Sequence, residues 1–278
     1  MTKIITDTTS GLPLDLAASF GISMIPQQVI FEEQSYQDDT GITTAEFLKK
    51  LKGSAILPKT AAPLPNMYTP FFTQAAKDKE TCIVIAPSAK ISGTARSAET
   101  ACQDFPGADI RIIDTQTIAG CVGTLALEAH HMAEAGKSPD EITATLNALI
   151  PRSRTYFVVD TLEYLQKGGR IGAARALLGE LLQVKPILQI KDGIVAPFAQ
   201  ERTKKRAVAR LVELVCEQLA GIIDPRLCLM HIDAEDEALA LRTVLCTRLK
   251  IEDIPIYLLP PAIVVHAGPK ALAIGFFE

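Results

Sequence analysis

The chain has 278 residues, a formal net charge of −4 and 48% hydrophobic residues. This length allows one large or two modest domains, and the slight negative charge offers no argument for nucleic acid as a partner. The first residues lack the apolar stretch of a signal peptide, and no run reaches the roughly 18–20 apolar residues of a membrane span. We therefore expect a soluble, cytoplasmic protein.

Strands and helices alternate over the first half of the chain. The expected strands cover residues 3–7, 23–31, 81–87 and 109–114. The expected helices cover residues 14–20, 43–52, 67–78, 94–105, 120–135 and 138–150. Such alternation is typical of βαβ units, so it predicts a parallel sheet with helices around it.

The second half has a different order. Its expected strands cover residues 155–161, 185–190, 194–200, 226–233, 254–259, 262–268 and 271–277, and its expected helices cover 162–166, 174–182, 203–219 and 234–249. Asp192-Gly193 between two apolar runs is a strong hairpin signal. The fold class we predict is therefore two-domain α/β, with a parallel-sheet domain at residues 1–153 and a mixed-sheet domain at residues 154–278.

Ser92-Gly93-Thr94 lies between an apolar strand and a helix. In open α/β sheets ligands bind at such strand ends, and free N–H groups at a helix start attract anions. The two hydroxyls add donors, and Gly93 lets a ligand approach the backbone. Simple N-capping by Ser92 is the alternative. A nucleophilic Ser92 is less supported because the G-x-S-x-G elbow is missing.

Two further segments have a similar character. Residues 57–65 form a proline-rich loop centred on Thr60, which either presents a hydroxyl or serves only as a linker. His266 ends an apolar run directly before Ala-Gly-Pro. A histidine in that place is either a structural hydrogen-bonding group or a ligand contact.

Gly168-Gly169-Arg170 interrupts a helix, and an Ala/Leu-rich helix follows at residues 174–182. A helix that is apolar around most of its circumference is buried. It is either plain core or one wall of an apolar tunnel. The residues that would line such a tunnel are Leu177, Leu178, Leu181 and Leu182.

The sequence shows no motif for a cofactor or a metal. G-x-x-x-x-G-K-[ST], G-x-G-x-x-G and H-E-x-x-H are all missing, and the six cysteines form no C-x-x-C pair. We therefore expect no cofactor, no metal site and free thiols.

In combination, several segments resemble the DegV family of bacterial fatty-acid-binding proteins. They read "ITDTTSGLP", "SGTARSA", "DTQTIAGCVG", "DTLEYLQKGGRIG", "RTKKRA" and "HAGPKALAIGF", together with Thr60 and Pro63. The resemblance spans residues 3–277. It departs from the family pattern at Ala61, where the family usually has Ser, and at Ala95-Arg96, where it usually has Tyr-Gln.

The resemblance implies that the chain binds one long-chain fatty acid and presents it to a separate ATP-dependent kinase subunit that makes acyl-phosphate. The implied carboxylate site is Thr60, Ser92, Gly93, Thr94 and His266. Arg170, Arg202 and Lys204 would lie near the mouth of the site or dock the partner. On this interpretation the chain has no catalytic residue of its own, its only small-molecule ligand is the fatty acid, and its contact with membranes is transient.

Two alternative functions belong to other classes. The first is an acyl hydrolase or transferase that uses Ser92 with His266. The second is a regulator that senses fatty acid and has no kinase partner.

Overall fold

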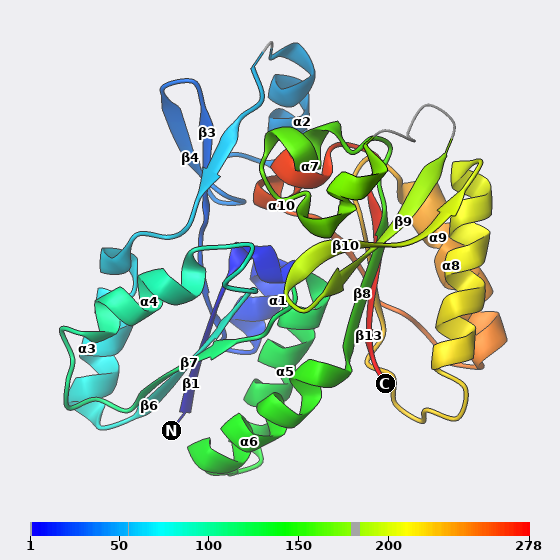
Figure 1. The fold of residues 1–278 in the computed structure, drawn as a ribbon. Helices are drawn as coiled ribbons and strands as arrows, with labels where there is room; N and C mark the ends of the chain where they lie inside the picture. The colour runs from blue at the N-terminus through cyan, green and yellow to red at the C-terminus, as the bar shows by residue number, and fades with distance from the viewer. Residues whose placement is uncertain (1, 55, 179–183) are drawn as a thin grey trace.

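The computed structural model describes residues 2–54, 56–178 and 184–278. Two β-sheets form the centres of two α/β domains, and a small third sheet lies beside them (Figure 1). The first large sheet is parallel and the second is mixed, so the predicted fold class is confirmed.

The N-terminal sheet has the order β2-β1-β6-β7, and all its neighbours are parallel. Its strands are β2 (Ser23–Ile25), β1 (Thr2–Asp7), β6 (Thr81–Ala86) and β7 (Ile110–Asp114). All six residues of β6 are buried, which explains its uninterrupted apolar run. Strand order reverses between β1 and β6, and open α/β sheets bind ligands at such a switch point.

Helices surround this sheet. They are α1 (Leu14–Ser19), α3 (Thr69–Asp78), α4 (Thr94–Cys102), α5 (Gly120–Glu134) and α6 (Pro139–Leu149). Short 3₁₀ turns occur at Thr8–Ser10, Pro65–Met67 and Ile150–Arg152. Ser138 and Glu141 form a capping box at the start of α6, with Pro139 at the first helical position.

The C-terminal sheet has the order β10-β9-β8-β13-β11-β12, in which only β11 and β12 are parallel neighbours. Its strands are β8 (Ser153–Val158), β9 (Lys185–Lys191), β10 (Ile194–Glu201), β11 (Cys228–His231), β12 (Ile256–Leu258) and β13 (Leu272–Phe277). The domain boundary predicted after residue 153 falls at the first residue of β8.

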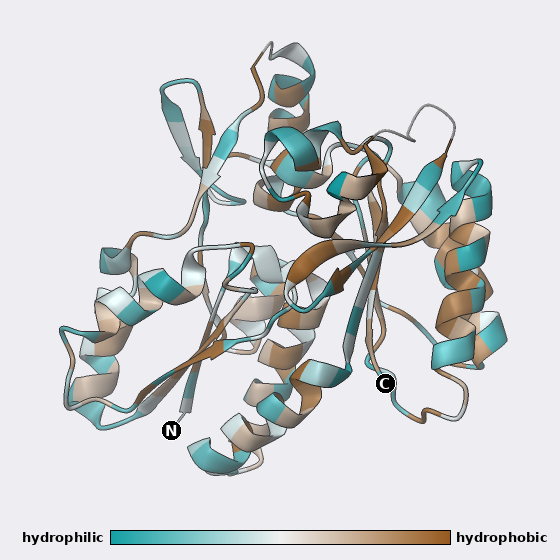
Figure 2. Cartoon of the chain, in the orientation of Figure 1, coloured by the Kyte–Doolittle hydropathy of each residue, from teal (hydrophilic) through white to brown (hydrophobic). Residues whose placement is uncertain are grey.

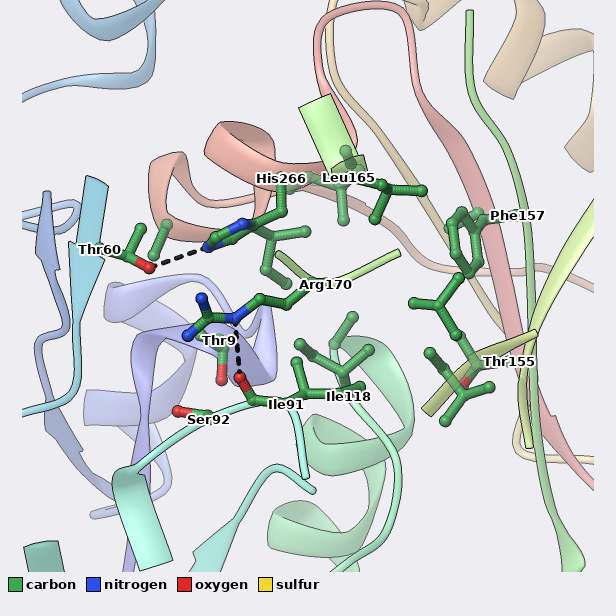
Figure 3. Close-up of a pocket in the computed structure, with 18 of the residues that line it drawn as sticks. Thr9, Thr60, Ile91, Ser92, Ile118, Thr155, Phe157, Leu165, Arg170 and His266 are labelled. Carbon is green, nitrogen blue, oxygen red and sulfur yellow. Dashed lines mark hydrogen bonds between the residues drawn. The ribbon is translucent and has the colours of Figure 1, made fainter. Parts of the chain in front are cut away.

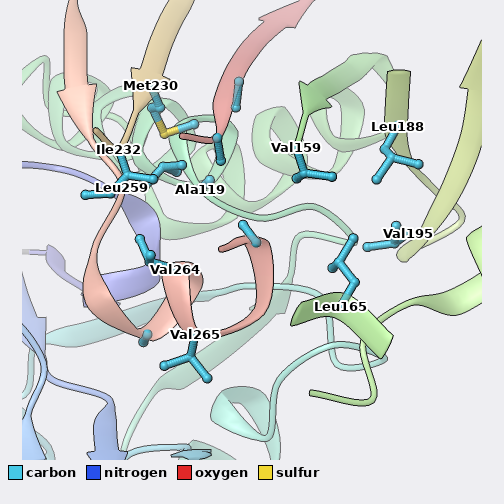
Figure 4. Close-up of a cluster of buried hydrophobic side chains, with 14 of the residues drawn as sticks. Ala119, Val159, Leu165, Leu188, Val195, Met230, Ile232, Leu259, Val264 and Val265 are labelled. Carbon is cyan, nitrogen blue, oxygen red and sulfur yellow. The ribbon is translucent and has the colours of Figure 1, made fainter. Parts of the chain in front are cut away.

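Helices cover both faces of the C-terminal sheet (Figure 1). Helices α8 (Lys204–Gln218) and α9 (Glu235–Leu249) bury their apolar residues in one cluster with β8, β11 and β13. On the other face lie α7 (Glu163–Lys167), a 3₁₀ helix (Gly172–Leu177) and α10 (Pro261–Ala267). Figure 4 shows the apolar cluster on this second face, which includes Leu165, Leu188 and Val264.

The third sheet was not expected. It has the order β4-β3-β5, from β4 (Gln34–Gln37), β3 (Gln28–Phe31) and β5 (Lys59–Ala61), and α2 (Thr44–Gly53) lies within the same segment. We predicted one strand at residues 23–31, which is wrong: Pro26 separates β2 from β3, and the two strands join different sheets. Proline has no N–H for a strand ladder, which explains the break. Val29 and Phe47 pack into the core of the C-terminal domain.

Two predicted elements near the candidate site also differ. Residues 262–268 were expected as a strand, but α10 (Pro261–Ala267) is a helix. Pro261 at its first position presets the helical φ, and Asp38 Oδ1 accepts the Ala262 N–H at 3.1 Å. Pro261 and the distant Asp38 together outweigh the strand preference of the β-branched Ile-Val-Val run.

The predicted helix at residues 174–182 begins as the 3₁₀ helix Gly172–Leu177. Leu177 and Leu178 pack in the apolar cluster beneath the sheet. Leu181 and Leu182 lie outside the described residues, so their predicted role as tunnel wall stays a prediction.

Hydropathy follows this layering. Figure 2 shows hydrophobic colour concentrated in the strands at the centre of both domains, while the outer helices alternate between hydrophobic and hydrophilic residues. Among the described residues, no helix combines the length and the apolar character needed to cross a bilayer.

Gly268→Ala tests the packing behind α10. Gly268 has φ +76°, and a Cβ there would lie 2.4 Å from Tyr164 Cδ2. We expect a loss of about 2–4 kcal/mol in the free energy of unfolding, from backbone strain plus overpacking. Urea denaturation measures it.

Gly136→Ala is the matched control, because Gly136 has φ +75° but nothing within 4 Å of a Cβ. It should lose only about 1 kcal/mol from strain. Equal losses in both variants would show that the contact with Tyr164 adds nothing.

Candidate functional site

A cavity lies between the two domains, at the carboxyl ends of β1 and β6. Both domains and the third sheet contribute to its wall. The lining residues are Thr9, Gln27, Thr60, Ala62, Ile91, Ser92, Gly93, Ile118, Ala119, Thr155, Phe157, Leu165, Arg170, Ile190, Val195, Leu259, Ala262, Ile263, His266, Ala267, Ala271 and Ala273. Figure 3 shows polar groups around Thr60, Ser92 and His266 and apolar side chains towards Phe157.

Thr60 and His266 meet at the polar end. Thr60 Oγ1 lies 2.9 Å from His266 Nε2, although the two residues are 206 positions apart (Figure 3). Thr60 is held on β5, which pairs with β3, and His266 is held on α10. When Nε2 carries the imidazole hydrogen it donates to Thr60, and the Thr60 hydroxyl is then free to donate into the cavity.

Burial keeps His266 neutral. Removal from water lowers the pKa of His266 to about 4, and the nearby Arg170 guanidinium acts in the same direction. Its Nδ1 is buried and has no hydrogen-bond partner among the described residues. A Cβ on Gly168 would come within 2.2 Å of that Nδ1, so glycine is required where the chain passes the ring.

Ser92 is arranged as a donor. Its Oγ lies 3.3 Å from Gln27 Nε2 and 3.3 Å from the Thr94 backbone N, and both of these groups donate N–H bonds. Gln27 Nε2 has only two hydrogens and lies closer to Asp7 Oδ2 at 2.6 Å and Thr94 Oγ1 at 2.8 Å, so its bond to Ser92 is the weakest of the three. Because the Thr94 hydroxyl donates to Asp7, the Ser92 hydrogen is available to Thr94 Oγ1, 3.0 Å away, or to an acceptor in the cavity.

Thr94 is committed elsewhere. Its hydroxyl donates to Asp7 Oδ2 at 2.5 Å, the side chain is buried, and it does not line the cavity. Its predicted contact with a carboxylate stays a prediction, but in this arrangement Thr94 acts through Ser92 and Asp7. Gly93 does line the cavity, and a Cβ there would lie 3.2 Å from Ala62 Cβ.

The Asp7 carboxylate accepts hydrogen bonds from several polar groups at this end of the cavity. The fully buried carboxylate also accepts the Thr9 N–H at 2.9 Å, the Thr9 hydroxyl at 2.5 Å and Gln27 Nε2 at 2.6 Å. Burial raises the pKa of Asp7, and the hydrogen bonds partly offset that effect. Asp7 also caps the 3₁₀ turn Thr8–Ser10, and the sequence analysis did not identify Thr9 or Gln27 as site residues. The hydroxyl-rich "TDTTS" at the end of β1 was a usable signal for Thr9, whereas nothing local marks Gln27.

Arg170 lines the cavity. Its Nε donates to the Ile91 carbonyl at 3.2 Å and its Nη1 to the Gly168 carbonyl at 2.9 Å. Among the lining residues that the structure describes, it alone carries a permanent charge. Three of its five N–H groups remain for an anion beyond these two bonds.

Arg202 and Lys204 do not line the cavity. Arg202 is exposed in the turn before α8. Lys204 Nζ joins α8 to α9 through Glu237 at 2.9 Å and also bonds the Lys270 carbonyl. The positions of these two residues therefore agree better with docking of a partner than with contact to the ligand headgroup.

The rest of the cavity wall is apolar. Phe157 on β8 and Ala273 on β13 are register partners at the end away from His266. Leu177 and Leu178 are not among the lining residues. No group of three or more metal-ligating side chains occurs in the part of the chain that the structure describes.

Comparison with known proteins identifies the family. A family profile described as "Uncharacterised protein, DegV family" matches residues 1–278. A DegV domain-containing protein of Clostridium perfringens is 35% identical over 280 residues, covering 99% of this chain and 98% of that protein. The chain therefore belongs to the DegV family.

Solved structures agree. A DegV family protein from Thermus thermophilus, described by its fatty acid binding, matches with a TM-score of 0.92 and 32% identity over 100% of this chain and 99% of its own. DegV of Bacillus subtilis, described as a fatty acid binding protein, matches with a TM-score of 0.90 and 30% identity over 100% and 99% of the two chains.

The buried imidazole predicts a pH-dependent stability. The unfolded chain binds a proton on His266 below about pH 6.5, but the folded chain does so only near pH 4. Stability should therefore fall as the pH drops through this window, and His266→Gln should remove about 2 kcal/mol of the fall. Urea denaturation at pH 7, 5.5 and 4.5 measures the difference between variant and wild type.

His131→Gln is the control, a substitution of a histidine on the exposed part of α5. It should leave the pH dependence of wild type. The argument fails if His266→Gln and His131→Gln lose stability in parallel on acidification.

Proposed function

We propose that this chain binds one long-chain fatty acid. One observation carries the proposal: the cavity has hydrogen-bond donors from both domains at one end and apolar side chains over the rest of its wall. The carboxylate is held by Thr60, Ser92, Gly93 and His266, with Thr94 in support. The fatty acid binding described for the two DegV structures above supports this assignment.

Energetics favour such a ligand. A carboxylate taken out of water needs several aligned donors, and charge-assisted hydrogen bonds are the strong ones. Burying a 16-carbon chain at about 0.8 kcal/mol per CH₂ contributes roughly 12 kcal/mol before association costs are subtracted. We propose that the acyl chain runs past Phe157 and Ala273, with Leu181 and Leu182 as further candidates for the tunnel wall.

The hydrogen bonds argue against a hydrolase. A nucleophilic serine needs a base within hydrogen-bond reach. The partners of Ser92 Oγ are Gln27 and Thr94, and His266 Nε2 bonds Thr60 instead. In the described contacts Ser92 and His266 form no nucleophile–base pair.

We further propose that the chain hands its ligand to a separate ATP-dependent kinase subunit in the cytoplasm. A carboxylate oxygen would attack the γ-phosphorus of ATP, ADP would leave, and the product would be acyl-phosphate for phospholipid synthesis. Thr60, Ser92, Gly93 and His266 would hold the carboxylate, with Arg170 at the mouth of the site, while the partner supplies the nucleotide. Contact with a membrane would be transient, for collection of the fatty acid.

Comparing the affinities for palmitic acid and hexadecanol distinguishes the contribution of the carboxylate from that of the hydrocarbon chain. We expect wild type to bind the acid more tightly, because the alcohol cannot use the full donor set. Ser92→Ala and His266→Ala should each weaken acid binding about tenfold to a hundredfold and leave alcohol binding nearly unchanged. Titration calorimetry with delipidated protein measures both ligands.

Ser35→Ala, a substitution on β4 outside the cavity lining, is the control and should match wild type. If the two site variants lose acid and alcohol binding alike, Ser92 and His266 support the fold and do not hold the carboxylate.

Arg202→Glu tests the docking surface. The residue is exposed and outside the cavity lining, so charge reversal should leave palmitic acid binding intact and slow acyl-phosphate formation by the partner kinase at least about tenfold. A coupled assay with ATP and the cognate subunit measures the rate.

Lys77→Glu makes the same charge change on α3 and should react at the wild-type rate. Loss of fatty acid binding in Arg202→Glu would place Arg202 at the headgroup. An unchanged rate in both variants would remove Arg202 from docking.

A further inference from the structure

The loop that carries Ser92 is attached to the opposite domain. It leaves β6 at Pro87 and runs to α4, so its chain neighbours belong to the N-terminal domain. The turn of the β9–β10 hairpin, Asp192-Gly193, belongs to the C-terminal domain and reaches this loop. Figure 1 shows the hairpin extending from the second sheet towards the N-terminal domain.

Two hydrogen bonds make this attachment, which we term the hairpin clasp. Ser88 Oγ donates to the Gly193 carbonyl at 2.7 Å, and Lys90 Nζ donates to the Asp192 carbonyl at 2.7 Å. Ser88 is fully buried, and its hydroxyl also accepts the Lys90 N–H at 3.3 Å. The fit is close, because a Cβ on Gly193 would lie 2.6 Å from Ser88 Oγ.

The clasp is linked directly to Ser92. The Ser88 carbonyl accepts both the Ile91 N–H and the Ser92 N–H at 2.9 Å, so a shift of Ser88 moves the turn that carries Ser92. The N-terminal domain holds the same loop through the Ser88 N–H to the Thr117 carbonyl at 2.8 Å. Ser88 therefore bonds both domains, and Arg170 bonds the same loop from the C-terminal domain through the Ile91 carbonyl at 3.2 Å.

This placement matters because the donors of the polar end come from both domains. Ser92 belongs to the N-terminal domain, whereas His266 and Arg170 belong to the C-terminal domain. A carboxylate can bond all of them only when the two domains keep one registration, since hydrogen bonds weaken steeply with distance and angle. The clasp joins the domains at four residues or fewer from Ser92.

We propose that Ser88 and Lys90 are positioning residues that set the spacing between Ser92 and His266 through the Asp192-Gly193 turn, and so determine the preference for a carboxylate headgroup. This inference rests on the proposed function and adds residues outside the cavity lining to it. Neither side chain touches the ligand in this account, because both act on the turn that carries Ser92.

The test uses Ser88→Ala, Lys90→Met and the double variant, each titrated with palmitic acid and hexadecanol. The double variant should lose about five- to tenfold in affinity for the acid and less than about twofold for the alcohol. Lys90→Met alone should show part of the same selective loss, and because Lys90 is exposed this variant does not depend on a buried hydroxyl for folding. Lys191→Met, on the same hairpin just before the turn, should match wild type.

Hydrogen–deuterium exchange gives a second readout that is independent of ligand. The amides of Ile91 and Ser92 should exchange faster in Lys90→Met and in the double variant than in Lys191→Met. Wild-type exchange together with wild-type acid affinity would overturn the clasp, and so would an equal loss for acid and alcohol. If wild type itself does not prefer acid over alcohol, the proposed carboxylate site fails, whereas the exchange result still decides whether the clasp holds the loop.

Discussion

The hydrogen bond between Thr60 and His266 is the contact on which the arrangement of this protein depends. It joins the third sheet to α10, and those two elements close the polar end of the cavity. Because burial keeps the imidazole neutral, His266 adds no buried positive charge to the cavity. The Thr60 hydroxyl can then donate a hydrogen bond into the cavity. The third sheet is needed because it brings Thr60, on β5, to the C-terminal domain.

Asp7 plays the corresponding part on the N-terminal side. Its carboxylate accepts hydrogen bonds from Thr9, Thr94 and Gln27. Because the Thr94 hydroxyl donates to Asp7, the Ser92 hydroxyl keeps its own hydrogen available for donation. A buried carboxylate with four donors is stable only if every donor keeps its place. The strand ends β1 and β6 meet at the switch point of the sheet, so the parallel topology supplies that rigidity.

Much of the fold was readable from local patterns. The alternation of strands and helices, the helix that starts after Ser138 and the Asp192-Gly193 turn each depend on neighbouring residues, and the structure has them where they were expected. The errors lie where a local pattern met a longer-range constraint. Pro26 divides an apolar run into two strands that join different sheets. The Ile-Val-Val run of α10 favoured a strand, but the Asp38 carboxylate accepts a backbone N–H at the start of that segment and supports a helix.

By itself the sequence determined the two sheets, the resemblance to the DegV family and the residue types of the polar end, Thr60, Ser92 and His266 among them. Only the tertiary structure decided which hydroxyls can donate, because their direction depends on Asp7, which lies 87 residues from Thr94 in the chain. It also revealed Gln27 and the hairpin clasp, whose partners are 65 and 105 residues away. Periodicity reports which face of an element is buried, whereas hydrogen-bond direction is fixed by partners that the chain brings together only when it folds.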